Sequence, residues 1–208
     1  MRLQIPKVYA ITDTRLSGLS HADQVARLVD GGATLIQLRE KHAAPKDFLR
    51  AAAAAFDVAE KQSVRIIIND RVDIAMALSA PGVHLGQTDL PVEVSRRLLP
   101  QSIIGVSTHN LAQVEHAARM PVDYIAFGPI FSTGTKADRE PVVGLNLLQQ
   151  AKQLTGDLPL VAIGGITAAN CLEVLHAGAD SVAVISALLA APAKISENTE
   201  RILSLAAE

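Results

Sequence analysis

The chain has 208 residues, with 19 Lys and Arg against 21 Asp and Glu, which gives a formal charge of −2. This balance argues against an electrostatic nucleic-acid binder, which would carry a basic stripe. With 49% hydrophobic and 19% charged residues, the chain can bury a sizeable core and is not predicted to be disordered. Its single cysteine, Cys171, excludes an intrachain disulfide.

No segment has the length of a membrane anchor. The longest late uncharged stretch, residues 181–193, is well short of the ~20 apolar residues that span a bilayer. The apolar run after the basic N-terminus stops at Asp13, which is too early for a signal peptide. We therefore expect a soluble cytoplasmic protein that binds neither nucleic acid nor membrane, and the sequence is compatible with association of identical chains.

Short runs rich in β-branched and aliphatic residues recur along the whole chain, and a segment with helical periodicity follows each of them. The predicted strands are residues 8–12, 35–39, 65–69, 82–86, 103–107, 124–129, 160–164 and 181–186. Among the helices between them, one opens at Ser20 and closes at Gly31, the longest spans residues 46–61, and one spans residues 168–175 after Thr167.

This alternation predicts an α/β fold in which neighbouring strands are parallel, because each connection is long enough for a crossover helix. An open doubly wound sheet usually has five or six strands and would leave the others unexplained. Eight units of about 26 residues favour a single-domain (β/α)8 TIM barrel over residues 1–208, at the short end of that fold's range. Its functional residues are then expected at the carboxyl ends of the strands.

The second predicted strand ends in a polar stripe. Gln37, Arg39 and Lys41 alternate along it and share one face, which would look into the mouth of the barrel. The alternative is an ion-pair layer with Glu40 or a neighbouring acid, since charges are rarely buried alone.

Two aspartates follow the next two predicted strands. Asp70 comes directly after Asn69, and Asp89 lies just past residue 86, so both can reach the same rim. Carboxylates without a cysteine or clustered histidine nearby suit a hard cation such as Mg²⁺, completed by phosphate and water. The alternative for each is a helix N-cap, a position at which aspartate is common.

The later strand ends carry hydroxyls, glycines and one lysine. Ser107 and His109 follow the fifth strand, and residues 128–136 after the sixth predict a mobile anion-binding lid or, alternatively, a plain surface loop. Gly165 and Ser186 end the last two strands, where many barrels bind phosphate, although a turn with positive φ also explains the glycine. His84, inside a strand, is expected to pack or to support the site.

Cations facing two aspartates fit Mg²⁺-pyrophosphate, and a second anion site would hold a phosphorylated partner. At these residues the chain closely resembles thiamine-phosphate synthases, over nearly its whole length from about residue 8 to 188. The segments that carry the resemblance are residues 37–41, 68–70, 84–89, 105–109, 128–131 with 133–136, and 162–166. Six segments in the family's order are far more specific than any one of them.

The resemblance implies a transferase that joins 4-amino-5-hydroxymethyl-2-methylpyrimidine pyrophosphate to hydroxyethylthiazole phosphate, giving thiamine phosphate and pyrophosphate. It implies Mg²⁺ on Asp70 and Asp89, and a pyrimidine contact from Gln37. It places Arg39, Lys41, Asn69, Ser107 and Lys136 on the pyrimidine pyrophosphate, with Arg39, Lys41, Ser107 and Lys136 as the catalytic set. It places Thr133, Thr135, Gly165, Ile185 and Ser186 on the thiazole phosphate.

The family's chemistry is dissociative, so it needs charge stabilisation and orientation rather than a nucleophile. His42 and Ser132 depart from the family's usual glycine and proline, but neither removes a named ligand. Two other functions fit parts of the pattern: a thiazole tautomerase of the same superfamily, which uses a histidine at the position of His109, and a non-catalytic regulator that binds a thiamine intermediate.

Overall fold

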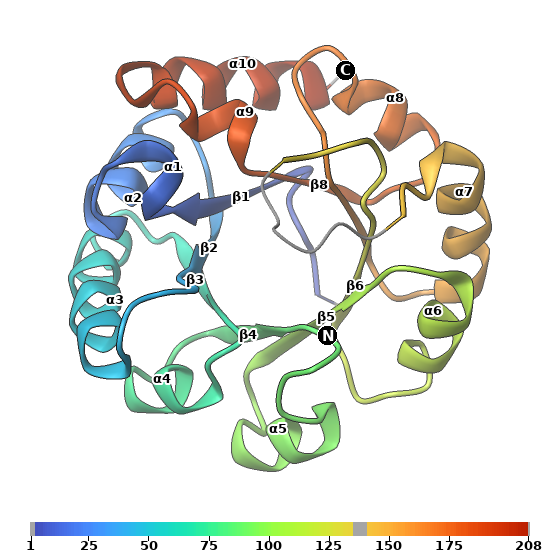
Figure 1. Cartoon of the computed structure of the whole chain (residues 1–208), viewed down its shortest axis with the longest axis horizontal. Coiled ribbons are helices and arrows are strands. Elements are labelled where there is room, and N and C mark those ends of the chain that lie inside the picture. The colour runs from blue at the N-terminus through green and yellow to red at the C-terminus, as the bar shows by residue number, and fades with distance from the viewer. Residues whose placement is uncertain (1–2, 135–140, 208) are drawn as a thin grey trace.

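The computed structural model describes residues 3–134 and 141–207. Its eight parallel strands close into a barrel in sequence order, with β1 paired to both β2 and β8 (Figure 1). The strands are β1 (Val8–Asp13), β2 (Leu35–Arg39), β3 (Arg65–Asn69), β4 (Gly82–Leu85), β5 (Ile103–Thr108), β6 (Tyr124–Phe127), β7 (Leu160–Ile163) and β8 (Ser181–Val184). The closed barrel predicted from the sequence is confirmed, and the open sheet is excluded.

Helices surround the barrel as an outer ring (Figure 1). They are α1 (Thr14–Ser17), α2 (His21–Asp30), α3 (Pro45–Glu60), α4 (Val72–Ala77), α5 (Val92–Leu98), α6 (Leu111–Ala117), α7 (Gly144–Thr155), α8 (Cys171–His176), α9 (Ser186–Leu189) and α10 (Ile195–Ala206), with a 3-10 turn at Pro192–Lys194. Within the described part of the chain, no helix has both the length and the apolarity that crossing a membrane requires.

Local sequence explains where several helices begin. The Ser20 hydroxyl accepts a hydrogen bond from the Asp23 N–H at the start of α2, and Pro45 occupies the first turn of α3, where its missing N–H costs nothing. The predicted start of the helix after Thr167 is wrong by three residues. There the Asn170 side chain accepts from the Thr167 N–H and closes a turn, so α8 begins only at Cys171.

Two apolar layers stabilise the barrel. One lies between the strands and the surrounding helices. The other fills the barrel interior with Tyr9, Ile11, Leu35, Ile67, Tyr124, Ala126, Val161 and Ala183. Side chains from β1, β2, β3, β6, β7 and β8 therefore meet inside the barrel, as the fold requires.

An acid in front of an even-numbered strand ties neighbouring elements together at two places. The Asp180 carboxylate, before β8, accepts from the Leu160 N–H of β7 at 2.7 Å and from Lys152 Nζ of α7 at 2.6 Å. Asp123, before β6, does the same for the N–H of Ile104 and the guanidinium of Arg96. Each carboxylate thus satisfies a backbone donor and a cation at once.

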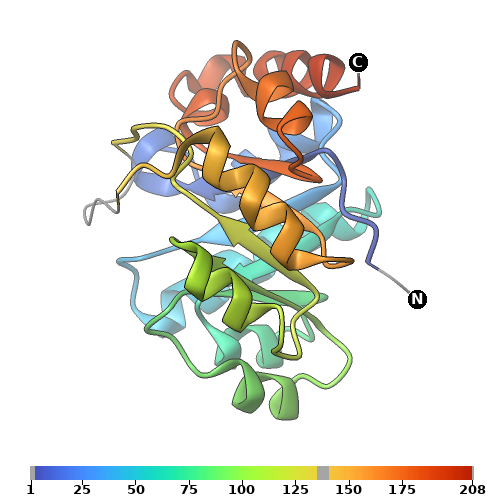
Figure 2. The ribbon, with the colours of Figure 1, turned by 90° about the vertical axis from the view of Figure 1, so that its right-hand side faces the viewer.

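The carboxyl ends of the strands gather at one end of the barrel. Figure 2 shows the segments that follow β2 and β6 projecting on the left, whereas the N-terminal segment lies on the right. Those of the polar residues predicted from the strand ends that the structure describes therefore lie at a single mouth.

Candidate active site

The polar stripe of β2 lies at this mouth, and its cations are paired. Arg39 Nη1 lies 2.5 Å from Asp13 Oδ2 at the end of β1, with both side chains mostly buried. Lys41 Nζ lies 2.5 Å from Asp70 Oδ2. Glu40 instead accepts from the Thr14 hydroxyl and from the N–H groups after it. The ion pairs considered from the sequence are thus present, but with these two aspartates and not with Glu40.

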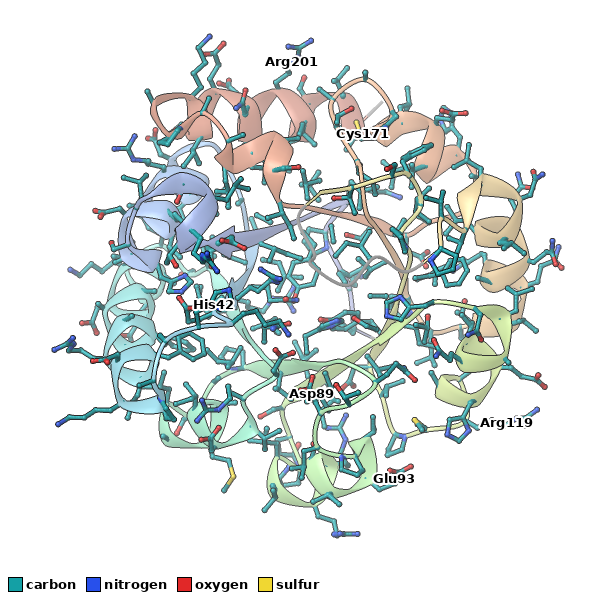
Figure 3. All side chains as sticks on the ribbon, viewed as in Figure 1. His42, Asp89, Glu93, Arg119, Cys171 and Arg201 are labelled. Atoms are coloured by element: carbon teal, nitrogen blue, oxygen red, sulfur yellow. The ribbon has the colours of Figure 1, made fainter. Side chains whose placement is uncertain are left out.

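Asp70 and Asp89 converge, as their positions after β3 and β4 predict. The pKa of Asp89 is raised, first by burial and then by its hydrogen bond and repulsion with Asp70, while a 2.6 Å hydrogen bond from the Gly86 N–H opposes this. Neither aspartate caps a helix, because α4 and α5 begin without a side-chain cap. Figure 3 shows Asp89 toward the inner rim of the barrel, whereas Glu93 and Arg119 lie at its periphery.

Asn69 and Ser107 bring neutral donors to the same mouth. Asn69 is 6% exposed, and its Nδ2 has no hydrogen-bond partner among the described residues. A buried amide donor without a partner is costly, so it marks a place where a ligand oxygen would be favourable. Ser107 Oγ lies 2.9 Å from His84 Nε2, so His84 contacts one of the predicted ligands.

The segment after β6 starts against the end of β7. The N–H of Ile130 donates to the Ile163 carbonyl, and the N–H of Phe131 donates to that of Gly164. Thr133 follows in the described part, whereas the predicted ligands Thr135 and Lys136 lie outside the described residues.

The predicted phosphate turns follow the adjacent strands β7 and β8. Gly165 has φ +65°, and a Cβ there would lie 2.7 Å from Phe131 Cβ. The conformational explanation for this glycine therefore applies, whether or not it also binds phosphate. Ile185 and Ser186 are half-buried where α9 begins.

His109 and His42 hold loops at the same rim. His109 Nδ1 lies 2.6 Å from the Gly128 carbonyl oxygen, so this imidazole contacts the start of the segment after β6. His42 Nε2 lies 2.8 Å from Arg15 Nη1 on the exposed side of the rim.

Sequence reasoning missed three residues that connect the predicted ones. Asp13 directly follows the predicted strand 8–12, as Asp70 follows the predicted strand 65–69, so the rule that found Asp70 would have found it. Tyr9 and Tyr124 lie at the start of strands, where only the barrel interior reveals a role. Asp13 holds Arg39, and the tyrosines join Gln37 to His84.

A closed eight-stranded barrel with cations, carboxylates and amide donors at its carboxyl-end mouth has the organisation of a (β/α)8-barrel enzyme. The chain belongs to the thiamine monophosphate synthase family, whose model matches residues 8–188. It is therefore a transferase of thiamine biosynthesis that acts on small molecules.

Named relatives are similar over most of their length. The thiamine-phosphate synthase of Albidiferax ferrireducens is 49% identical over 92% of this chain and 88% of its own. That of Chloroflexus aurantiacus is 45% identical over 89% and 86%. The solved thiamine phosphate pyrophosphorylase of Pyrococcus furiosus is 34% identical, with a TM-score of 0.89 over 97% of this chain and 95% of that one.

Proposed function

We propose that the chain joins 4-amino-5-hydroxymethyl-2-methylpyrimidine pyrophosphate to hydroxyethylthiazole phosphate, with release of pyrophosphate. The observation that carries this proposal is the convergence of Asp70, Asp89 and Lys41 at the mouth of a barrel of this family. A thiazole tautomerase has no use for a carboxylate pair beside a lysine.

The donor set fits Mg²⁺. Asp70 and Asp89 repel one another, and among the described residues no group of three or more His, Cys, Asp or Glu is placed to hold a metal ion without other ligands. Two carboxylates completed by phosphate oxygens and water are a usual Mg²⁺ environment. When bound, the ion would neutralise charge on the departing pyrophosphate.

Arg39 and Lys41 act on the pyrophosphate as charge partners. Asp13 holds the Arg39 guanidinium in one orientation, which reduces the ordering cost when an anion binds. The buried Asn69 amide gains the acceptor it lacks in the free protein. Ser107 and Lys136 add a hydroxyl and a cation to the same leaving group.

The reaction then needs no protein base. The bond between the pyrimidine methylene carbon and oxygen breaks, and its electron pair leaves on pyrophosphate. The thiazole nitrogen supplies the pair that forms the new carbon–nitrogen bond. Gln37 orients the pyrimidine, and Thr133, Thr135, Gly165, Ile185 and Ser186 hold the thiazole phosphate beside it.

The test is pyrophosphate release by the purified protein given both substrates and Mg²⁺, with the product identified by mass. We expect equal amounts of thiamine phosphate and pyrophosphate, and none when the thiazole phosphate is left out. Isomerisation of a thiazole phosphate without condensation would favour the tautomerase, and binding without turnover would favour a regulator.

A further inference from the structure

A chain of hydrogen bonds crosses the aliphatic barrel interior and joins two of the proposed ligands. Gln37 Nε2 donates to the Tyr9 hydroxyl at 3.0 Å, and the Tyr9 and Tyr124 hydroxyls are 3.1 Å apart. The Tyr124 hydroxyl is 2.8 Å from His84 Nδ1, and His84 Nε2 is 2.9 Å from Ser107 Oγ. The three middle residues belong to none of the proposed substrate contacts.

The contact between Tyr124 on β6 and His84 on β4 depends on a glycine in the strand between them. Tyr124 and His84 are both register partners of Gly105 on β5. A Cβ at Gly105 would lie 2.0 Å from Tyr124 Cζ, so the tyrosine ring occupies that space. The ring thereby reaches across one strand and stacks on His84, with centroids 5.5 Å apart and planes 22° from parallel.

Counting the available protons fixes which group donates in each hydrogen bond from Gln37 to Ser107. The Gln37 amide nitrogen can only donate, so Tyr9 accepts there and has one proton left for Tyr124. If Tyr124 donated to Tyr9 instead, the buried Tyr9 proton would have no acceptor among these hydrogen-bonded side chains. Tyr124 therefore donates to His84 Nδ1, and His84 carries its proton on Nε2 and donates to Ser107. Burial raises the pKa of both phenols, which keeps them protonated donors.

This direction of donation fixes the orientation of the polar groups at both ends of the hydrogen-bonded row, Ser107 and Gln37. Ser107 Oγ accepts from His84 and keeps its own proton for an acceptor on the substrate side. Gln37 turns its amide nitrogen toward Tyr9, so its carbonyl oxygen faces away from that hydroxyl. A buried network of polar groups in an apolar core costs stability unless every member is satisfied, and here the last donor is the half-buried Ser107 hydroxyl, which is placed to donate to water or to a ligand.

We propose that Tyr9, Tyr124 and His84 are positioning residues that orient the Ser107 hydroxyl as a donor to the pyrophosphate and the Gln37 amide as an acceptor for the pyrimidine. This inference rests on the proposed function, because it takes Ser107 and Gln37 as substrate ligands. Tyr124 serves the Ser107 end, and Tyr9 serves the Gln37 end.

The test is a double-mutant cycle on the single-turnover rate with both substrates and Mg²⁺. Tyr124→Phe keeps the ring and removes the hydroxyl, and we expect it to slow condensation about tenfold, the size of one oriented hydrogen bond. In the Ser107→Ala background the same change should slow it less than about twofold, because the group it orients is gone. A purely structural role of Tyr124 would give the same loss in both backgrounds.

Ser181→Ala is the matched control. The Ser181 hydroxyl is fully buried on β8 and has no hydrogen-bond partner among the described residues, so its removal also deletes one buried hydroxyl from this barrel. We expect its condensation rate to stay within about twofold of wild type. Urea unfolding of each variant shows whether it is folded at the assay temperature.

Tyr9→Phe tests the other end independently, and serves if Tyr124→Phe does not fold. It should raise the KM for the pyrimidine pyrophosphate in wild type but not in Gln37→Ala. Equal losses in paired backgrounds at either end would overturn the inference while leaving the proposed function intact. If Ser107→Ala and Gln37→Ala leave rate and KM unchanged, the proposed ligand roles fail instead.

Discussion

Replacing Asp89 by asparagine should change stability in opposite directions with and without Mg²⁺. Asparagine keeps an oxygen for the Gly86 N–H but removes the charge that Asp70 repels. Two like charges about 4 Å apart repel by ~1 kcal/mol in water and ~4 kcal/mol near a protein surface. Because Lys41 already compensates Asp70, we expect a gain near the lower value.

For a chain of this length, about 1 kcal/mol raises Tm by about 2–4 °C. Mg²⁺ at about 100 times its Kd should stabilise the wild type by about 2.7 kcal/mol, and the variant much less. Asp89→Asn should therefore melt above wild type in a chelator and below it in Mg²⁺, and its Mg²⁺-dependent turnover should fall by more than about 100-fold.

The assay is thermal unfolding with chelator or with Mg²⁺ alone, which needs no substrate. Asp57→Asn, on the exposed face of α3, makes the same charge change far from the carboxylate pair. It should melt like wild type both in chelator and in Mg²⁺. An equal Mg²⁺-induced shift in Asp89→Asn and wild type would refute the metal assignment. A lower Tm of the variant in chelator would refute the repulsion argument.

Three further changes test other parts of the structure. Asp180→Ala should lower the free energy of unfolding by about 1–3 kcal/mol, because the buried Leu160 N–H loses its acceptor. Asp180→Asn keeps an acceptor and should lose less than ~1 kcal/mol, so equal losses of the two variants in urea titrations would contradict this. Burial lowers the pKa of His21, so as pH drops the unfolded chain takes up this proton before the folded protein does. The free energy of unfolding should therefore fall below pH ~6.5, and it should fall less steeply in His21→Gln. Identical pH profiles of unfolding for the two proteins would contradict this. Gly165→Ala should raise the KM for thiazole phosphate and lower Tm, because its Cβ would strike Phe131; unchanged values of both would show that the turn adapts.

The barrel could be predicted because each strand carries its own signal. A strand buried on both faces is a short aliphatic run, and Gly31 or Ser20 marks a helix end locally. Boundaries that depend on a side chain reaching back are less visible. Asn170 displaces the start of α8 by closing a turn with Thr167, a competition that the helical pattern does not record.

The mouth of the site was predictable for a related reason. A charged residue at the end of a buried strand is conspicuous, so Arg39, Lys41, Asp70 and Asp89 stand out from their aliphatic neighbours. The interior chain was not predictable. Tyr124 reaches His84 only because Gly105 on the strand between them leaves room, and Tyr9 meets Tyr124 only because the barrel closes. Neither condition can be read from residues near Tyr124 in the sequence.

The charges at the mouth bear on the proposed divalent cation. Among the described residues, the three carboxylates Asp13, Asp70 and Asp89 face the two cations Arg39 and Lys41. Both cations are already paired, so this part of the mouth offers pyrophosphate no net attraction. If the proposed Mg²⁺ binds Asp70 and Asp89, the balance at this part of the mouth would become net positive, and Lys41 would no longer be the sole cation beside Asp70. The ion pairs Arg39–Asp13 and Lys41–Asp70 thus keep the cations oriented, and under the proposed function we expect pyrophosphate binding to depend on Mg²⁺.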